Sequence, residues 1–200
     1  MTIARLKITI FAGDICEAGA EVLCTSTNPR LTLAMGTGGS VRDRGGYGIL
    51  RECERIVETA GGSLPPGSVH ETSAGDLSAR AVMHCVASDS DHRSSAQTVE
   101  SCVRESLAMA NAKGFASIAM PVFAAGHASF GFARSLEAMA RAIKNASTRV
   151  AQLIIVVYDA GRADEAATIL RAALPAATID ITKGPERDDE RPGLWSSDWS

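Results

Sequence analysis

Short apolar segments alternate along this chain with segments of helical periodicity. Strand-like patterns are predicted at residues 3–11, 21–24, 68–72, 81–87, 117–122, 153–158 and 178–181. Helical patterns lie between several of them, at residues 47–60, 95–112, 134–145 and 163–173. Strands that are followed by helices favour an α/β fold, in which a mixed, largely parallel sheet is covered on both faces.

The composition is that of a globular domain. Hydrophobic residues make up 46% of the 200 residues and charged residues 22%, with a net charge of -3 and a pI near 5.8. General nucleic-acid binding uses a basic surface, so we do not expect it here, and an anionic ligand would have to be held locally. The chain has no run of roughly 18 apolar residues that would span a membrane. We therefore expect a soluble, cytoplasmic protein.

The five cysteines are far apart and include no C-x-x-C pair. An odd number at such spacings indicates neither a disulfide framework nor a zinc site. We expect reduced thiols that pack as small hydrophobic residues, and neither a metal nor a cofactor.

A change of character near residue 183 predicts one domain, residues 1–183, followed by an acidic tail, residues 184–200. The segment "KGPERDDERPGLWSSDWS" has two prolines, a charge cluster and too little hydrophobic content to build a core. Trp195 and Trp199 lie in it. The tail is either a solvated end or a short motif that binds a partner, because exposed tryptophan is favoured at interfaces.

Two glycine-rich segments, "LTLAMGTGGSVRDRGG" at 31–46 and "AAGHASFGF" at 124–132, follow predicted strands. Open α/β sheets bind ligands at the carboxyl ends of their strands, and backbone N–H groups there can cradle an anion. Both segments are therefore expected as loops that hold phosphate, with plain turns as the alternative. The phosphate-binding motif with its lysine is missing, and the first strand ends in "FAGDI" instead of a dinucleotide fingerprint.

The order of the motifs resembles that of macrodomains over residues 3 to 175. The matching segments are "GDI" at 13–15, a strand ending in Asn28, "RDRGG" and "ILREC", "PPGSVHETSAGDLSARAVMHCV", "PVFAAG" and "VVYD". The resemblance implies a three-layer α/β/α sandwich with a mixed, largely parallel sheet. It also implies a cleft for ADP-ribose between the two glycine-rich loops.

The resemblance assigns roles to individual residues. Asp14 would accept a hydrogen bond from the adenine amino group, and Asn28 would lie near the distal ribose. Either Tyr158 or Arg162 would lie beside the adenine. The expected ligand-binding residues are Asp14, Ile15, Asn28, Gly36, Thr37, Gly38, Gly39, Ala125, Gly126, His127, Ala128, Ser129, Phe130, Gly131 and Tyr158.

The chain departs from the family pattern at positions that matter for catalysis. Ala34 and Met35 replace two glycines, and Thr25 replaces an asparagine. Gly38 stands where hydrolytic relatives carry an acidic residue that helps to activate water. Asn28 and His127 are the remaining candidates for catalysis, because imidazole titrates near neutral pH; Asp43 and Asp89 are weaker ones.

His84 and Cys85 are adjacent in a predicted buried strand, so their side chains point to opposite faces and do not form a nucleophilic pair. We interpret both as structural.

Three functions remain open. The chain is a binding module for ADP-ribose or a related nucleotide, free or on an ADP-ribosylated protein. Alternatively it is an ADP-ribosyl hydrolase or O-acetyl-ADP-ribose deacetylase. The presence of Asn28 is compatible with such an enzyme, whereas Gly38, in place of an acidic residue, favours binding without catalysis. The third alternative is an interaction scaffold that works through the tail.

Overall fold

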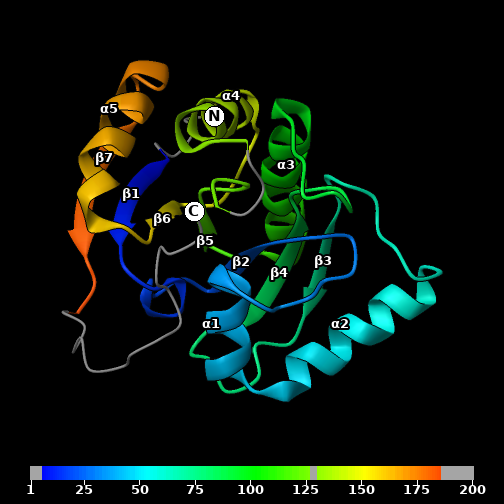
Figure 1. The fold of residues 1–200 in the computed structure, drawn as a ribbon. Coiled ribbons are helices and arrows are strands. Elements are labelled where there is room, and N and C mark those ends of the chain that lie inside the picture. Colours follow the sequence, from blue (N-terminus) through cyan, green and yellow to red (C-terminus); the bar gives the residue numbers. More distant parts are fainter. Residues whose placement is uncertain (1–5, 127–129, 186–200) are drawn as a thin grey trace.

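A seven-stranded sheet in the order β3-β4-β2-β5-β6-β1-β7 forms the centre of the molecule (Figure 1). It was obtained as a computed structural model that describes residues 6–126 and 130–185. The strands are β1 (Lys7–Ala12), β2 (Val22–Thr27), β3 (Val69–Thr72), β4 (Ala81–Val86), β5 (Ser117–Pro121), β6 (Gln152–Val157) and β7 (Thr178–Lys183). Neighbouring strands are parallel except for β3, which is antiparallel to β4.

Helices cover both faces of the sheet (Figure 1). They are α1 (Gly36–Gly45), α2 (Tyr47–Thr59), α3 (Ala96–Lys113), α4 (Phe132–Asn145) and α5 (Ala163–Ala173). One hydrophobic cluster joins the sheet to α3, α4 and α5, and the other joins its opposite face to α1 and α2. The predicted three-layer α/β/α fold with a largely parallel sheet is confirmed.

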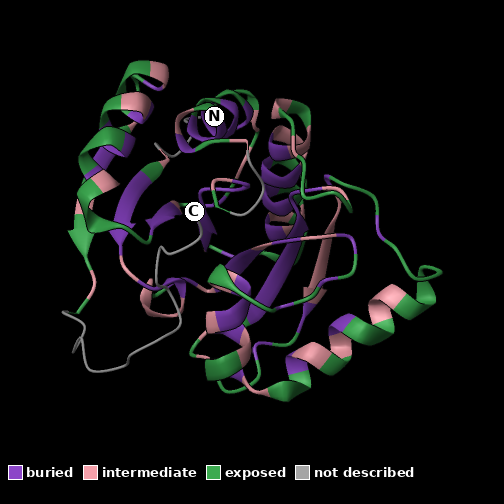
Figure 2. Ribbon diagram, viewed as in Figure 1, coloured by how far each residue is buried: buried purple, intermediate pink, exposed green. Residues whose placement is uncertain are grey.

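Local sequence explains most of these elements. Strand β6 reads QLIIVV and is buried from Leu153 to Val157 (Figure 2), as expected for a central strand with helices on both faces. Helix α3 begins where the Ser95 hydroxyl accepts from the Thr98 N–H at 3.1 Å, and it ends at Gly114, whose φ of 71° suits glycine. No helix in the described ranges is long and apolar enough to cross a membrane.

The prediction of a loop throughout residues 31–46 is wrong. Helix α1 occupies Gly36–Gly45, although its glycines have low helix propensity and no apolar periodicity. Its stability comes instead from close packing: a Cβ at Gly45 would lie 2.5 Å from Ile49 Cδ1. Strand β2 also runs on to Thr27, three residues beyond the predicted end.

His84 is buried in β4 and both of its ring nitrogens have partners. Nδ1 lies 3.0 Å from the Thr25 hydroxyl and Nε2 lies 2.9 Å from the Thr72 hydroxyl. Because the Thr72 hydroxyl donates to the Ser73 carbonyl, it accepts from Nε2–H, and Nδ1 accepts from Thr25. The structural interpretation of His84 is confirmed.

All five cysteines are free, and Cys85 is among the four that are fully buried. The thiols therefore pack as small hydrophobic groups, as predicted.

Candidate functional site

Four segments that carry predicted ligand-binding residues meet at the carboxyl edge of the sheet. Strands β2, β5, β6 and β1 are successive neighbours, so the residues that follow them lie side by side. Asn28, Ala125, Tyr158 and Asp14 come from these four segments. The structure thus brings together residues far apart in sequence. His127, Ala128 and Ser129 lie outside the described residues.

Asp14 follows β1 and is 8% exposed. One carboxylate oxygen accepts from the Cys16 N–H at 3.0 Å and caps a short 3-10 helix, Ile15–Glu17. The other lies 3.5 Å from Nη2 of Arg44, which also pairs with Glu17 at 2.8 Å. A donor from a ligand would therefore share that second oxygen with Arg44. Burial, and after it the charge of Asp14, raise the pKa of the Cys16 thiol to about 12, so this thiol is neutral.

Asn28 follows β2, and its side chain closes the turn that begins at this residue. Its amide oxygen accepts from the N–H groups of Arg30 at 3.0 Å and Thr32 at 3.4 Å. Its amide nitrogen donates to the Thr32 hydroxyl at 2.7 Å. An amide oxygen has two lone pairs and the nitrogen two hydrogens. Among the residues that the structure describes, one N–H of Asn28 therefore has no acceptor.

The first turn of α1 contains the predicted residues Gly36, Thr37, Gly38 and Gly39. The N–H groups of Gly36, Thr37 and Gly38 precede the first intrahelical hydrogen bond, which the Gly39 N–H donates to the Met35 carbonyl at 3.1 Å, and the helix dipole places partial positive charge at this end. Anions bind at such helix ends for these two reasons. The glycines assigned to a phosphate loop thus lie at a helix amino terminus, which presents the same kind of donor.

The second glycine-rich segment begins with a strained turn after β5. Ala124 has a φ of 53°, a left-handed conformation that residues other than glycine rarely adopt. The Ala124 N–H donates to the Ser26 hydroxyl at 3.2 Å, and the Phe123 carbonyl accepts from the buried Ser135 hydroxyl of α4. Both hydrogen bonds hold the turn that leads into Ala125 and Gly126.

The far end of this segment starts α4. Gly131 precedes that helix with a φ of 95°, and Phe130 packs in part against the larger core cluster. Tyr158, directly after β6, is 50% exposed. Arg162 lies with its guanidinium carbon 3.8 Å from the centre of the Phe132 ring and pairs with Glu165 at 3.0 Å.

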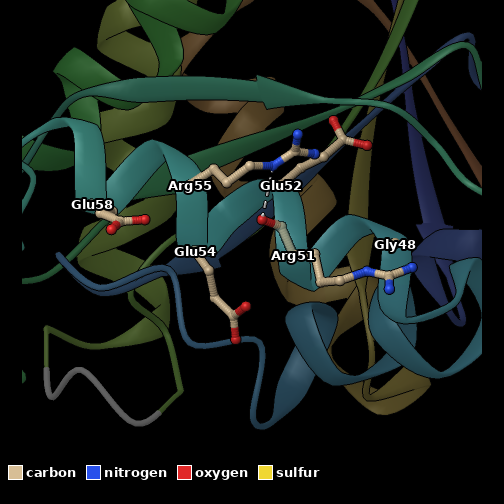
Figure 3. A pocket seen from close by; sticks show the side chains of 6 residues that line it. All are labelled: Gly48, Arg51, Glu52, Glu54, Arg55 and Glu58. Atoms are coloured by element: carbon tan, nitrogen blue, oxygen red, sulfur yellow. Dashed lines mark hydrogen bonds between the residues drawn. The ribbon is translucent and has the colours of Figure 1, made fainter.

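A separate hollow lies over the outer face of α2, away from this edge (Figure 3). It is lined by Gly48, Arg51, Glu52, Glu54, Arg55 and Glu58. The sticks in Figure 3 project from consecutive turns of one helix, and Arg55 Nε donates to the Arg51 carbonyl at 3.4 Å. A row of charged side chains of both signs on one helix is a solvated surface, so the carboxyl edge remains the candidate site.

Comparisons with known proteins agree with this geometry. The family model described as "Macro domain" matches residues 24–139. A macro domain-containing protein of Streptomyces coelicolor is 34% identical, over 80% of this chain and 95% of the relative. The chain belongs to the macro domain family.

A further sequence relative and a solved structure also match the chain. An O-acetyl-ADP-ribose deacetylase of Klebsiella pneumoniae is 29% identical over 82% of this chain and 94% of its own length. A solved variant of the Oceanobacillus iheyensis macrodomain with ADPR superimposes with a TM-score of 0.72 at 22% identity. That match covers 83% of this chain and 90% of the other.

Gly38 is the position at which the resemblance implies an acidic residue in hydrolytic relatives. It is buried, and a Cβ there would lie 3.2 Å from Leu33 Cα and 3.3 Å from Leu33 Cδ2. Leu33 is itself held, because Arg42 Nη1 donates to its carbonyl at 2.9 Å. The segment before α1 therefore occupies the space that a larger side chain would need.

Sequence reasoning missed three polar residues of this macrodomain edge: Ser26, Arg44 and Ser135. Arg44 pairs with the predicted Asp14, Ser26 accepts from Ala124 beside the predicted Ala125, and Ser135 donates to Phe123 in the same turn. Ser26 offered a signal, because it stands one residue after Thr25 in a segment where the family pattern reads V-N-A-A-N and has alanine. Arg44 lies within the matching segment "RDRGG" but was given no role there, and Ser135 lies within a helix and carries no motif.

Proposed function

We propose that this macrodomain binds ADP-ribose or an ADP-ribose derivative at the carboxyl edge of its sheet. The adenine amino group donates to Asp14, and the pyrophosphate lies between the first turn of α1 and the segment that begins at Ala125. The distal ribose lies near Asn28, which has one N–H to offer a hydroxyl. Free ADP-ribose and ADP-ribose carried on a protein present the same chemistry to these groups.

One observation carries the proposal: a helix amino terminus and the turn after β5 adjoin at the end of β2. Ser26 is hydrogen bonded to both, to Thr37 of α1 at 3.3 Å and to Ala124 at 3.2 Å. Two backbone segments rich in small residues can approach a diphosphate closely from either side, and no lysine is required. Membership of the macro domain family and the ADPR named for the Oceanobacillus iheyensis structure support the choice of ligand.

Calorimetric titration with ADP-ribose, AMP and NAD tests the proposal, with Asp14→Ala as the variant. A hydrogen bond to a charged group contributes about 1.5–3 kcal/mol, so the variant should bind ADP-ribose roughly tenfold more weakly or worse. Glu17→Ala is the matched control, because it removes the other carboxylate that pairs with Arg44 and leaves Asp14 in place. Equal affinity of Asp14→Ala and wild type for every adenine nucleotide would refute the adenine assignment.

A second candidate function, removal of an acyl or ADP-ribosyl group, is favoured by the relatives that are named O-acetyl-ADP-ribose deacetylases. Because Gly38 offers no base, turnover should be slow, and a positioned general base contributes on the order of 10²- to 10⁴-fold in rate. Asn28→Ala and His127→Ala should lower any residual rate. Rapid hydrolysis of O-acetyl-ADP-ribose that both variants retain would contradict this view.

A further inference from the structure

Ser26 connects the two segments that are proposed to hold the pyrophosphate. Its N–H donates to the Thr37 hydroxyl in the first turn of α1, at 3.3 Å. Its own hydroxyl accepts from the N–H of Ala124, at 3.2 Å. Ser26 is the fifth residue of β2, and β2 lies between β4 and β5 in the sheet. The hydroxyl of Ser26 thus contacts the Ala124 turn, and its backbone N–H contacts the first turn of α1.

The turn at Ala124 needs such an anchor. A φ of 53° at an alanine is a strained conformation that persists only where surrounding contacts hold it. The contacts on this turn come from two serines on opposite sides. Ser26 accepts from the Ala124 N–H, and Ser135 donates to the carbonyl of Phe123.

We infer that Ser26 is a positioning residue that keeps the first turn of α1 and the Ala124 turn at a fixed separation. The inference rests on the proposed function for its ligand but not for its geometry. With the hydroxyl in place, both backbone segments are aligned before the pyrophosphate arrives. Without it, the Ala124 turn loses a hydrogen bond that holds its positive φ, and the backbone that follows at Ala125 and Gly126 is no longer kept at a fixed separation from α1.

The central experiment compares Ser26→Ala with Ser117→Ala. Ser117 is a matched control, because its hydroxyl accepts from the Glu21 N–H at 2.9 Å. That hydrogen bond also connects β5 to the residue before β2, but it lies at the amino ends of the strands, opposite the candidate site. Loss of one such bond should lower the thermal midpoint similarly in both variants. Only Ser26→Ala should weaken ADP-ribose binding, by about 3- to 10-fold.

Two further variants separate positioning from simple stability. Ala124→Gly in the Ser26→Ala background should restore most of the affinity, because glycine adopts a positive φ without strain. Thr37→Val breaks the other connection to Ser26. If Ser26 aligns both segments as one unit, the double variant Ser26→Ala/Thr37→Val should bind ADP-ribose no more weakly than the poorer single variant. The losses of binding free energy in the two single variants would then not be additive.

Amide hydrogen exchange of the ligand-free protein gives a readout that does not depend on ADP-ribose. Exchange at Ala124 should become faster in Ser26→Ala and stay unchanged in Ser117→Ala. If this exchange pattern is observed but the wild-type protein does not bind ADP-ribose, the proposed function is wrong and the positioning role of Ser26 is retained. Unchanged exchange at Ala124, or an affinity for ADP-ribose within twofold of wild type, would overturn the inference.

Discussion

The two glycine-rich segments of this macrodomain look alike in sequence and use glycine for different reasons. In the first, a Cβ at Gly38 or Gly45 would lie 3.3 Å or less from a buried leucine or isoleucine side chain. In the second, a Cβ at Gly126 or Gly131 would meet no atom of the residues that the structure describes within 4 Å. Glycine therefore allows close internal packing of α1 in one case. In the other it leaves the backbone open to solvent.

This difference separates a structural from a functional use of the same residue. A glycine that is packed by its neighbours can be explained by the fold alone. A glycine with open space and no positive φ, as at Gly126, is explained by neither packing nor backbone strain. At Gly126, in the segment proposed to hold the pyrophosphate, we propose that the open space gives a ligand access to the backbone, and substitutions at the two kinds of position should therefore have opposite signatures.

The largest effect is expected for Gly126→Glu. The new side chain fits the free protein, so circular dichroism and the thermal midpoint should remain those of wild type. A carboxylate at this point should repel the pyrophosphate and fill its space, and ADP-ribose binding should fall below detection in calorimetry.

Gly48→Glu is the control for this variant, because Gly48 is exposed on α2 and also has no atom within 4 Å of a Cβ. It should bind ADP-ribose as wild type does. Retained binding by Gly126→Glu would show that the second segment does not approach the pyrophosphate.

A second large effect is expected on the stability of the protein at low pH. It comes from His84, which lies on the sheet face under the first glycine-rich segment. Burial lowers the pKa of His84 from 6.5 to about 4, with a smaller contribution from His70. The unfolded chain thus binds a proton between pH 6.5 and 4 that the folded protein excludes. Stability should be full above pH 6.5 and fall by about 3 kcal/mol as the pH approaches 4.

Urea unfolding at a series of pH values measures this loss. His84→Gln keeps one donor and one acceptor without titrating, so its stability should be lower at pH 7 and vary less between pH 6.5 and 4. His70→Gln is the comparison, since burial lowers the pKa of His70 in the same direction. The pKa of the Glu52 carboxyl is lowered, mainly by the hydrogen bond from the Ser73 hydroxyl, so protonation of Glu52 reduces stability only below pH 4.5. An unchanged slope in His84→Gln would contradict the assignment.

The fold could be predicted largely from periodicity, and the reasons are visible in particular elements. Helix α5 is observed at the predicted residues 163–173, because its apolar residues recur along one face and Pro175 follows. Helix α1 could not be found this way, since what stabilises it is contact with residues distant in sequence, such as Leu77 beside Gly45. Periodicity reports on a helix's own apolar face, which α1 scarcely has.

The site was accessible from sequence only where a residue carries a motif. Asp14 and Asn28 follow strands within recognisable segments, and the sheet order then places them at one edge. Their hydrogen-bond partners could not be predicted, because the contact between Arg44 and Asp14 depends on how α1 is oriented. The second glycine-rich segment was predicted as a loop without the left-handed turn at Ala124, which no residue type signals.

The smallest expected effect is the most direct test of the contrast between packed and open glycines. Gly38→Ala and Gly48→Ala make the same change in two helices. Gly48 is exposed in the first turn of α2, where alanine, with its higher helix propensity, should stabilise by up to about 0.5–1 kcal/mol, so Gly48→Ala should raise the free energy of unfolding. At Gly38 the new methyl group would lie 3.2 Å from Leu33 Cα, and overpacking costs about 1–3 kcal/mol. Gly38→Ala should therefore be destabilising in urea unfolding; equal gains in both variants would show that the segment before α1 yields freely and that Gly38 is not required by packing.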